Sequence, residues 1–145
     1  MEFPSDVIII GGGKSIVEGM NLGLKEKIQN KFVIGTNYSF KTFPSTFLTF
    51  IDRDFYHPKL DDTGNLPNPD FYEELKNLPL IIGINHNGVE EFKLDNTILL
   101  PKLEKENLTG ILALKLAIRL MDEGNIYLLG FDWSRRAGLP ERDPN

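Results

Sequence analysis

The stretch Asp6-Val7-Ile8-Ile9-Ile10-Gly11-Gly12-Gly13-Lys14-Ser15 carries the strongest fold signal in the chain. Its first half, Asp6–Ile10, is an apolar run rich in β-branched residues. Such a run is typical of a parallel strand that helices cover on both faces. The run stops at three glycines, and a helical pattern follows directly. This succession of strand, glycine turn and helix predicts the first unit of an open α/β sheet.

The helix after the glycine turn is predicted to extend from Ser15 to about Gln29. Ser15 and Glu18 form a capping-box pattern, in which each side chain accepts a hydrogen bond from a free amide of the first turn. One apolar face has helical spacing. Its members are Val17, Met20, Leu24 and Ile28.

Further strands and helices are predicted to alternate along the chain. The strand patterns are Phe32–Thr36, Thr46–Ile51, Leu80–Ile84, Ile98–Leu100 and Ile126–Leu129. The helical patterns are Asp70–Lys76 and Thr109–Glu123, and the stretch from His57 to Pro69 is predicted to be a surface loop. The helix Thr109–Glu123 has an apolar face of Ile111, Leu114, Ile118 and Met121 and is expected to be well covered by the rest of the fold. Gly124, in a left-handed conformation, is predicted to end it. The fold class is therefore α/β: a three-layer Rossmann-like open sheet, mostly parallel, with Asp6–Ile10 as a central strand.

Composition indicates one folded domain over residues 1–145, with 134–145 as a loose tail. Hydrophobic residues make up 41% of the 145 residues and charged residues 26%, which argues against a wholly disordered chain. The net charge of -5 argues against general nucleic-acid binding. The chain has no cysteine, which excludes disulfides and thiolate chemistry. No membrane segment or signal peptide is expected, and the expected location is the cytoplasm.

Ligands of open α/β sheets bind beyond the carboxyl ends of the strands, near the topological switch point. The glycine turn Gly11, Gly12 and Gly13 lies at such a position, and Lys14 and Ser15 follow it. Glycines let an anion approach the backbone, and the first amides of a helix point toward it. The turn is predicted to bind the phosphate of a nucleotide, although it is neither a Walker A loop nor a complete dinucleotide fingerprint. A tight turn without a ligand is the alternative.

Three other polar positions at this edge are candidates for nucleotide binding. Asn37 ends the second strand, where it offers a donor and an acceptor to a base or ribose, or forms an Asx turn instead. Thr109 and Gly110 open the long helix and form a second candidate anion or sugar site, with simple capping as the alternative.

Two carboxylates follow the third strand, in the sequence Asp52-Arg53-Asp54. Carboxylates one residue apart can share a Mg²⁺ ion with a diphosphate, so Asp52 and Asp54 are candidate metal ligands. A solvated acidic turn is the alternative. Asp132, after the last strand, and His86, after the fourth, are the candidate catalytic residues. The phenylalanines and tyrosine between 40 and 56 are expected to pack in the core and loops.

These features occur in the order found in one Rossmann-like family. Val7–Ser15 resembles the family's "GxGPSL" start, Val33–Asn37 its second strand and Thr49–Asp52 its third. Thr109-Gly110 with its helix, followed by Ile126–Asp132, resembles the "SG…A…A…IYLxGxD" block. The family contains the flagellin-modifying Maf proteins, archaeal 6-hydroxymethylpterin diphosphokinases and related small phage proteins. Bacterial lipooligosaccharide sialyltransferases are similar to it.

The resemblance implies nucleotide contacts at Gly11, Gly13, Ser15 and Asn37. It also implies ligand-edge roles for Asp52, Thr109, Gly110 and Asp132. Two departures matter. Lys14 replaces the usual proline, and the catalytic histidine and tyrosine pair of the sialyltransferases has no counterpart after Asp132.

The predicted function is a nucleotide-binding transferase of the glycosyltransferase or diphosphokinase kind. It would transfer a glycosyl or diphosphoryl group from a nucleotide or nucleotide-sugar donor. The alternative is a non-catalytic protein, phage-encoded in one version of this hypothesis, that binds a nucleotide or a partner. The sequence does not predict an oligomeric state.

Overall fold

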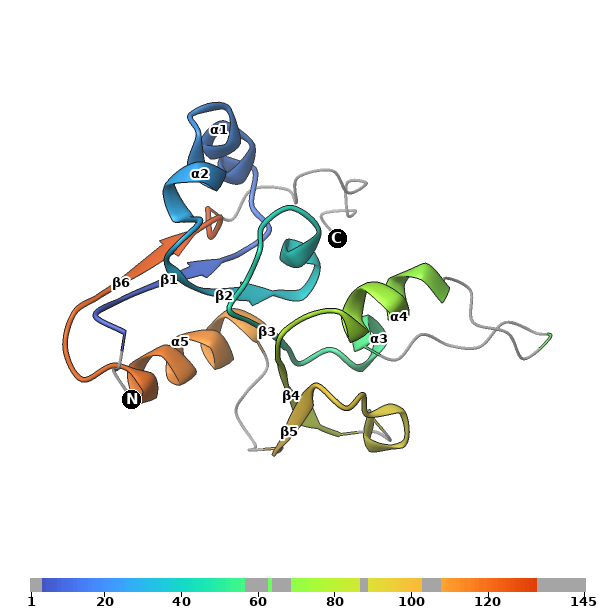
Figure 1. The fold of residues 1–145 in the computed structure, drawn as a ribbon. Coiled ribbons are helices and arrows are strands. Elements are labelled where there is room, and N and C mark those ends of the chain that lie inside the picture. The colour runs from blue at the N-terminus through green and yellow to red at the C-terminus, as the bar shows by residue number, and fades with distance from the viewer. Residues whose placement is uncertain (1–3, 57–62, 64–68, 87–88, 103–107, 133–145) are drawn as a thin grey trace, which may run out of the picture.

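The computed structural model describes residues 4–56, 63, 69–86, 89–102 and 108–132. Its six strands form one all-parallel sheet with helices on both faces (Figure 1). The predicted α/β class and open three-layer sheet are therefore confirmed. In chain order the elements are β1 (Asp6–Ile10), α1 (Ser15–Asn21), α2 (Leu24–Ile28), β2 (Phe32–Thr36), η1 (Asn37–Lys41), β3 (Phe47–Phe50), α3 (Arg53–Tyr56), α4 (Pro69–Lys76), β4 (Ile81–Asn85), η2 (Val89–Phe92), β5 (Thr97–Pro101), α5 (Thr109–Leu120) and β6 (Asn125–Leu129).

The strand order is β5-β4-β3-β2-β1-β6, so β1 pairs with a neighbour on each side. From β1 to β5 each new strand is added on the same side of the previous one. The chain then crosses back through α5 and places β6 on the other side of β1. Parallel crossovers are right-handed, so connections that step in opposite directions must lie on opposite faces of the sheet. The topological switch point therefore lies between β1 and β6.

The side chains of β1 alternate between two hydrophobic layers. Val7 and Ile9 pack with Ala113 and Ala117 of α5, on what we call the α5 face. Ile8 and Ile10 point to the opposite face, where Ile16 of α1 is packed with them. A third buried cluster continues this opposite face over β3, β4 and β5. Figure 1 shows the same division, with α1 and α2 on one side of the sheet and α5 on the other.

The third cluster contains most of the aromatic side chains between residues 40 and 56. Phe50 stacks on Tyr56 at a ring-centroid distance of 4.5 Å, and both rings are buried. The Tyr56 hydroxyl accepts a hydrogen bond from the Leu94 amide at 2.6 Å and donates one to Thr97 Oγ1 at 3.0 Å. The expectation that these aromatic residues pack in the core is confirmed.

The prediction of one continuous helix from Ser15 to Gln29 is wrong. The segment is divided into α1 and α2, because Gly23 between them has a left-handed φ of 78°. The predicted apolar face is also wrong in part, since Val17 is half-exposed and Met20 is exposed. Ile16, which the prediction left out, is the buried residue of α1.

The helix predicted from Thr109 to Glu123 ends earlier, at Leu120. Met121 follows in an extended conformation, so Gly124 belongs to the next turn, where its φ is 131°. The expectation of full coverage is wrong, because Ile111 and Ile118 are exposed. The buried residues of α5 are Leu112, Ala113 and Ala117. The small alanines allow the helix to lie close to the sheet.

All six strands coincide with the predicted ones within one residue at each end. The short helices η1, α3 and η2 were not predicted. A helix of four or five residues is too short to produce an apolar period. Pro69, predicted to end a loop, begins α4. The rest of that loop, apart from Thr63, lies outside the described residues, and so does the predicted tail 134–145.

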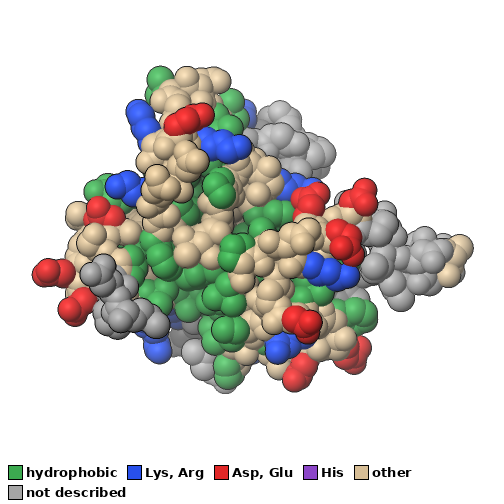
Figure 2. Space-filling view, in the orientation of Figure 1, with side chains coloured by type: hydrophobic (Ala, Val, Ile, Leu, Met, Phe, Trp, Pro, Cys, Tyr) green, Lys and Arg blue, Asp and Glu red, His purple; other side chains and the backbone are tan. Residues whose placement is uncertain are grey.

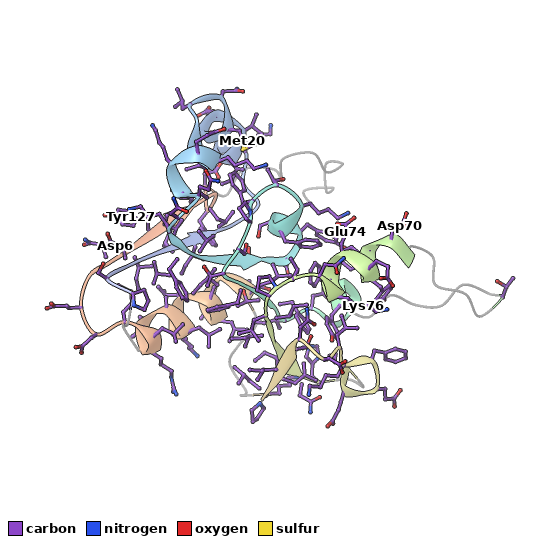
Figure 3. All side chains as sticks on the ribbon, viewed as in Figure 1. Asp6, Met20, Asp70, Glu74, Lys76 and Tyr127 are labelled. Atoms are coloured by element: carbon purple, nitrogen blue, oxygen red, sulfur yellow. The ribbon has the colours of Figure 1, made fainter. Side chains whose placement is uncertain are left out.

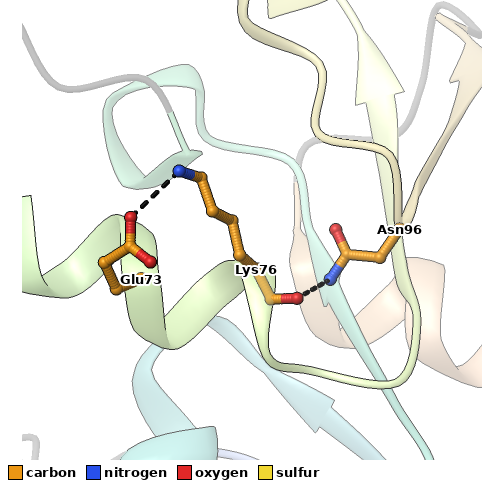
Figure 4. Close-up of polar contacts among 3 residues, drawn as sticks. All are labelled: Glu73, Lys76 and Asn96. Carbon is orange, nitrogen blue, oxygen red and sulfur yellow. Dashed lines mark hydrogen bonds and ion pairs between the residues drawn. The ribbon is translucent and has the colours of Figure 1, made fainter.

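Asn96, just before β5, holds the end of α4. Its side-chain Nδ2 donates to the carbonyl oxygens of Leu75 at 2.8 Å and Leu78 at 2.9 Å. Figure 4 shows a longer contact of 3.4 Å to the Lys76 carbonyl, beside the exposed ion pair of Lys76 with Glu73. The last carbonyls of a helix lack partners within the helix, so a side-chain donor stabilises this end.

We expect Asn96→Ala to lower the free energy of unfolding by about 1–2 kcal/mol, because the Leu75 and Leu78 carbonyls lose the hydrogen bonds from the Asn96 side chain. Asn77→Ala is the matched control, since Asn77 is exposed at the end of the same helix. Urea unfolding of both variants measures the difference. Equal stability of the two variants would show that the Asn96 contacts contribute nothing.

Candidate functional site

The glycine turn after β1 contacts the segment after β6. The Gly11 amide donates to the Leu129 carbonyl at 2.7 Å, and the Gly13 amide donates to the Gly130 carbonyl at 2.8 Å. Gly130 itself has a left-handed φ of 79°. The first and last strands of the sheet therefore remain joined beyond their last paired residues, at the topological switch point.

Asp132 fills the position at the start of α1 where an anion was expected. Its carboxylate accepts from the Ser15 hydroxyl at 2.8 Å and from the Ser15 amide at 3.3 Å. The Ile16 and Val17 amides donate to the carbonyls of Gly13 and Lys14. The first turn of α1 therefore has partners within the chain, and its amides give no argument for an external phosphate. Phosphate binding at this turn stays a prediction.

The predicted capping box of Ser15 and Glu18 is wrong. Lys14 is the N-cap of α1 and makes no capping hydrogen bond through its side chain. Ser15 is already the first helical residue, and its hydroxyl bonds across the sheet edge to Asp132. A carboxylate at a helix N-terminus is favoured by the helix dipole, which explains why Asp132 takes this position.

Two of the three glycines are explained by packing. A Cβ on Gly11 would overlap the Gly130 carbonyl and crowd the Phe131 ring, and a Cβ on Gly13 would overlap Asp132 Oδ1. Gly12 differs, because it is exposed and a Cβ there would meet no described atom within 4 Å. Packing does not require the absence of a side chain at Gly12, so this position is open to a ligand.

Gly110 belongs to the same cluster through Phe131. A Cβ on Gly110 would overlap this ring, which also lies against Gly11. Thr109 is the first residue of α5, and the N-cap is Leu108 without a side-chain capping bond, so the capping interpretation of Thr109 is wrong. Phe131 was missed by the sequence analysis. Its only signal is its place between Gly130 and Asp132 after a strand.

Asn37 stands at the carboxyl end of β2 with a left-handed φ of 48°. Its Oδ1 is buried, and among the described residues no group donates a hydrogen bond to it, so the Asx turn is not formed. The Ser39 and Ser45 hydroxyls lie beside Gly35, one position before Thr36. Ser45 Oγ is also buried without a partner among the described residues. Sequence analysis missed both serines, because they follow β2 with no strand or helix pattern of their own.

Asp52 and His86 lie farther along the sheet. Asp52 is exposed just after β3, and the Asp54 side chain lies outside the description. His86, half-buried after β4, contacts the Ile51 carbonyl through Nε2. A carbonyl only accepts, so Nε2 is the donor in this contact. Nδ1 is buried with no partner among the described residues.

The predicted site residues therefore form two groups. Gly11–Ser15, Thr109, Gly110 and Asp132 surround the ends of β1 and β6. Asp52 and His86 follow β3 and β4. Neighbouring strands are about 4.8 Å apart, so β1 and β4 are separated by about 14 Å across the sheet. Asn37 on β2 lies between the groups. The two catalytic candidates, Asp132 and His86, are not brought together.

Comparisons with known proteins identify no relative. No protein-family model matches the chain, and neither a curated protein nor a solved structure matches it. Among the helices of the described residues, none has the length and apolar character needed to cross a membrane.

The glycine analysis predicts a sharp contrast between neighbouring positions. Gly13→Ala should cost about 1–3 kcal/mol of stability, because its Cβ displaces Asp132. Gly12→Ala should change stability by less than about 0.5 kcal/mol, since its Cβ points into open space. Differential scanning calorimetry compares the two variants. In an Asp132→Ala background the Gly13 penalty should shrink, and an unchanged penalty would contradict the assigned contact.

Proposed function

We propose that the chain binds a nucleotide-type ligand at the carboxyl edge of β1 and β2. The observation that carries this proposal is the buried Oδ1 of Asn37, which accepts no hydrogen bond from a described residue. Buried polar atoms nearly always have a partner, and leaving one unpaired costs about 1–3 kcal/mol. A ribose hydroxyl or a base N–H group would supply the missing donor.

Two neighbouring features support a nucleotide in this place. Ser45 Oγ adds a second buried oxygen without a partner among the described residues. Gly12, at the end of the adjacent strand β1, leaves room for a ligand close to the backbone. A ligand with several polar groups in an extended arrangement fits both positions. The switch point of an open α/β sheet is also where such ligands generally bind.

The proposed reaction is transfer of a glycosyl or diphosphoryl group from the bound nucleotide. Such reactions depend mainly on positioning and on neutralising charge, so they need no nucleophile on the protein. In this proposal Asp52, with Asp54, holds Mg²⁺ against a diphosphate at the end of β3. Asp132 positions Ser15 and the glycine turn, since its carboxylate is bonded to Ser15.

A non-catalytic binding protein is the second candidate function. The observation that favours it is that both catalytic candidates already have partners within the chain. Asp132 accepts a hydrogen bond from Ser15, and His86 Nε2 contacts a backbone carbonyl. Incubation of any bound nucleotide or nucleotide sugar with the protein separates the two functions. Release of the free nucleotide or of the transferred group supports the transferase. Binding without turnover supports the non-catalytic protein.

Binding is tested by thermal unfolding with nucleoside phosphates and nucleotide sugars. A ligand at one hundred times its Kd should add about 2.7 kcal/mol of stability, a rise in Tm of roughly 5–10 °C. Asn37→Gly keeps the left-handed conformation and removes the acceptor. We expect the apo Tm of this variant to be no lower than that of the unmodified protein, because the unpaired oxygen is gone, and its affinity for the ligand to be about tenfold weaker. No shift with any compound would contradict the proposal, and unchanged affinity of Asn37→Gly would remove Asn37 from the site.

The Mg²⁺ proposal has its own test. Asp52→Asn should weaken ligand binding in the presence of Mg²⁺ and leave the Tm of the apo protein nearly unchanged, because substitutions of exposed residues usually change stability little. Titration calorimetry with Mg²⁺ or with EDTA measures the effect. Asp95→Asn, which changes an exposed carboxylate before β5, is the control. Equal affinity with Mg²⁺ and EDTA would exclude the metal role.

A further inference from the structure

β6 is an edge strand with an unusual exposure. It pairs with β1 on one side and is the last strand of the described sheet on the other. All-parallel sheets are normally covered on both faces. In β6, however, Tyr127 is 48% exposed on one face and Leu128 is 52% exposed on the other.

The outward backbone groups of β6 can be identified from its bonds to neighbouring chain. The Leu129 carbonyl accepts from the Gly11 amide, and the Asn125 amide donates to the Ser5 carbonyl. The backbone polar groups of Leu129 and Asn125 therefore point toward β1. The backbone amides and carbonyls of successive residues point alternately to the two sides of a strand, so those of Tyr127 also point toward β1. The amides and carbonyls of Ile126 and Leu128 therefore point away from the sheet, and no described strand pairs with them.

The two edges of the sheet are protected differently. Natural proteins block edge strands with proline, lysine and other charged residues. β5 ends in Pro101 and Lys102 follows it, while an acidic residue stands two positions before each strand, Asp95 before β5 and Glu123 before β6. Asn125–Leu129 of β6 contains neither proline nor charge. In Figure 2 hydrophobic side chains spread across the middle of the face between the α1–α2 layer and α5, with charged side chains mostly at its rim.

We propose that β6 pairs antiparallel with β6 of a second copy of this chain, around a two-fold axis at Tyr127. In this register Ile126 of each copy lies opposite Leu128 of the other. Each of these pairs exchanges both of its hydrogen bonds, so all outward amides and carbonyls of Ile126 and Leu128 are used. The two Tyr127 residues form the closer, non-hydrogen-bonded pair. The sheets of the two copies become one continuous sheet.

A second copy fits because the surface beside the edge is apolar on both faces. On α1, Ile16 lies against Gly130 and Gly19 faces Leu24 of α2, and Val17, next to Ile16, is half-exposed. Figure 3 shows Tyr127 extending outward from β6. Side chains of this size with this exposure present on the order of 100 Å² each. The exposed apolar side chains on and next to β6 are Val17, Tyr127, Leu128 and Phe131.

The area approaches that of a small stable interface. Four such side chains supply roughly 400 Å², and the main chain of β6 adds to it, whereas a stable interface buries about 600–1,000 Å² per partner. A two-fold axis requires one surface that is complementary to itself. An antiparallel pair of identical apolar strands meets that requirement, because every outward donor finds the corresponding acceptor.

The absence of cysteine from the chain permits a clean test. In the proposed register the two Tyr127 Cα atoms are about 4.5 Å apart, within the range of a disulfide. Tyr127→Cys should therefore form a covalent dimer under mild oxidation, which non-reducing electrophoresis detects at twice the 16.5 kDa chain mass. Leu128→Cys should remain uncrosslinked, because its Cα is about 8 Å from its symmetry mate. Ile98→Cys is the control on β5, since Ile98 is 49% exposed.

Sedimentation equilibrium of the unmodified chain tests association without substitution. We expect twice the chain mass at micromolar concentration, and the monomer mass for Tyr127→Lys, in which two charges would face each other. Ile98→Lys should keep the dimer mass. A monomeric unmodified chain overturns the proposal, as does equal cross-linking of all three cysteine variants. Cross-linking of Leu128→Cys alone would overturn the register. If Tyr127→Lys fails to fold, as circular dichroism would show, the cysteine variants decide the question.

Discussion

β1 forms hydrogen bonds with strands on both of its sides, and this double pairing constrains the rest of the fold. With β2 on one side and β6 on the other, the side chains of β1 must be covered from both faces. Val7 and Ile9 on one face and Ile8 and Ile10 on the other are all buried. Because the crossovers to the two neighbours step in opposite directions, their helices occupy opposite faces. The two hydrophobic layers follow from this arrangement.

The same double pairing brings early and late parts of the described chain together. Gly11 bonds to Leu129, the last residue of β6, Gly13 bonds to Gly130 after it, and Asp132 then reaches the start of α1. The electrostatic preference of a helix N-terminus for negative charge is met within the chain. A pattern that resembles a phosphate-binding loop is thus largely explained as a joint between the first and last strands. The unexplained polar atoms lie one strand away, at Asn37 and Ser45.

Function and assembly depend on different parts of this arrangement. The nucleotide proposal rests on the buried Oδ1 of Asn37 at the carboxyl edge of β2 and on the open space at Gly12, whereas the dimer proposal rests on the outer edge of β6. The strand β1 lies between Asn37 and the outer edge of β6. A ligand at β2 can therefore bind without competing for the β6 edge. The joint formed by Asp132 and Ser15 connects them, because it holds the end of β6 against the turn that follows β1.

Local sequence determined the strands, since an apolar β-branched run bounded by glycine or polar residues is recognisable wherever it occurs. It also determined which residues reach the carboxyl edge, because that follows from alternation of strands and helices. Tertiary structure alone decided what those residues do there. Ser15 bonds to Asp132, 117 positions away, rather than to Glu18, and no local pattern encodes so distant a partner. Likewise Ile16 rather than Val17 is buried on α1, because the position of β6 selects the covered side of the helix.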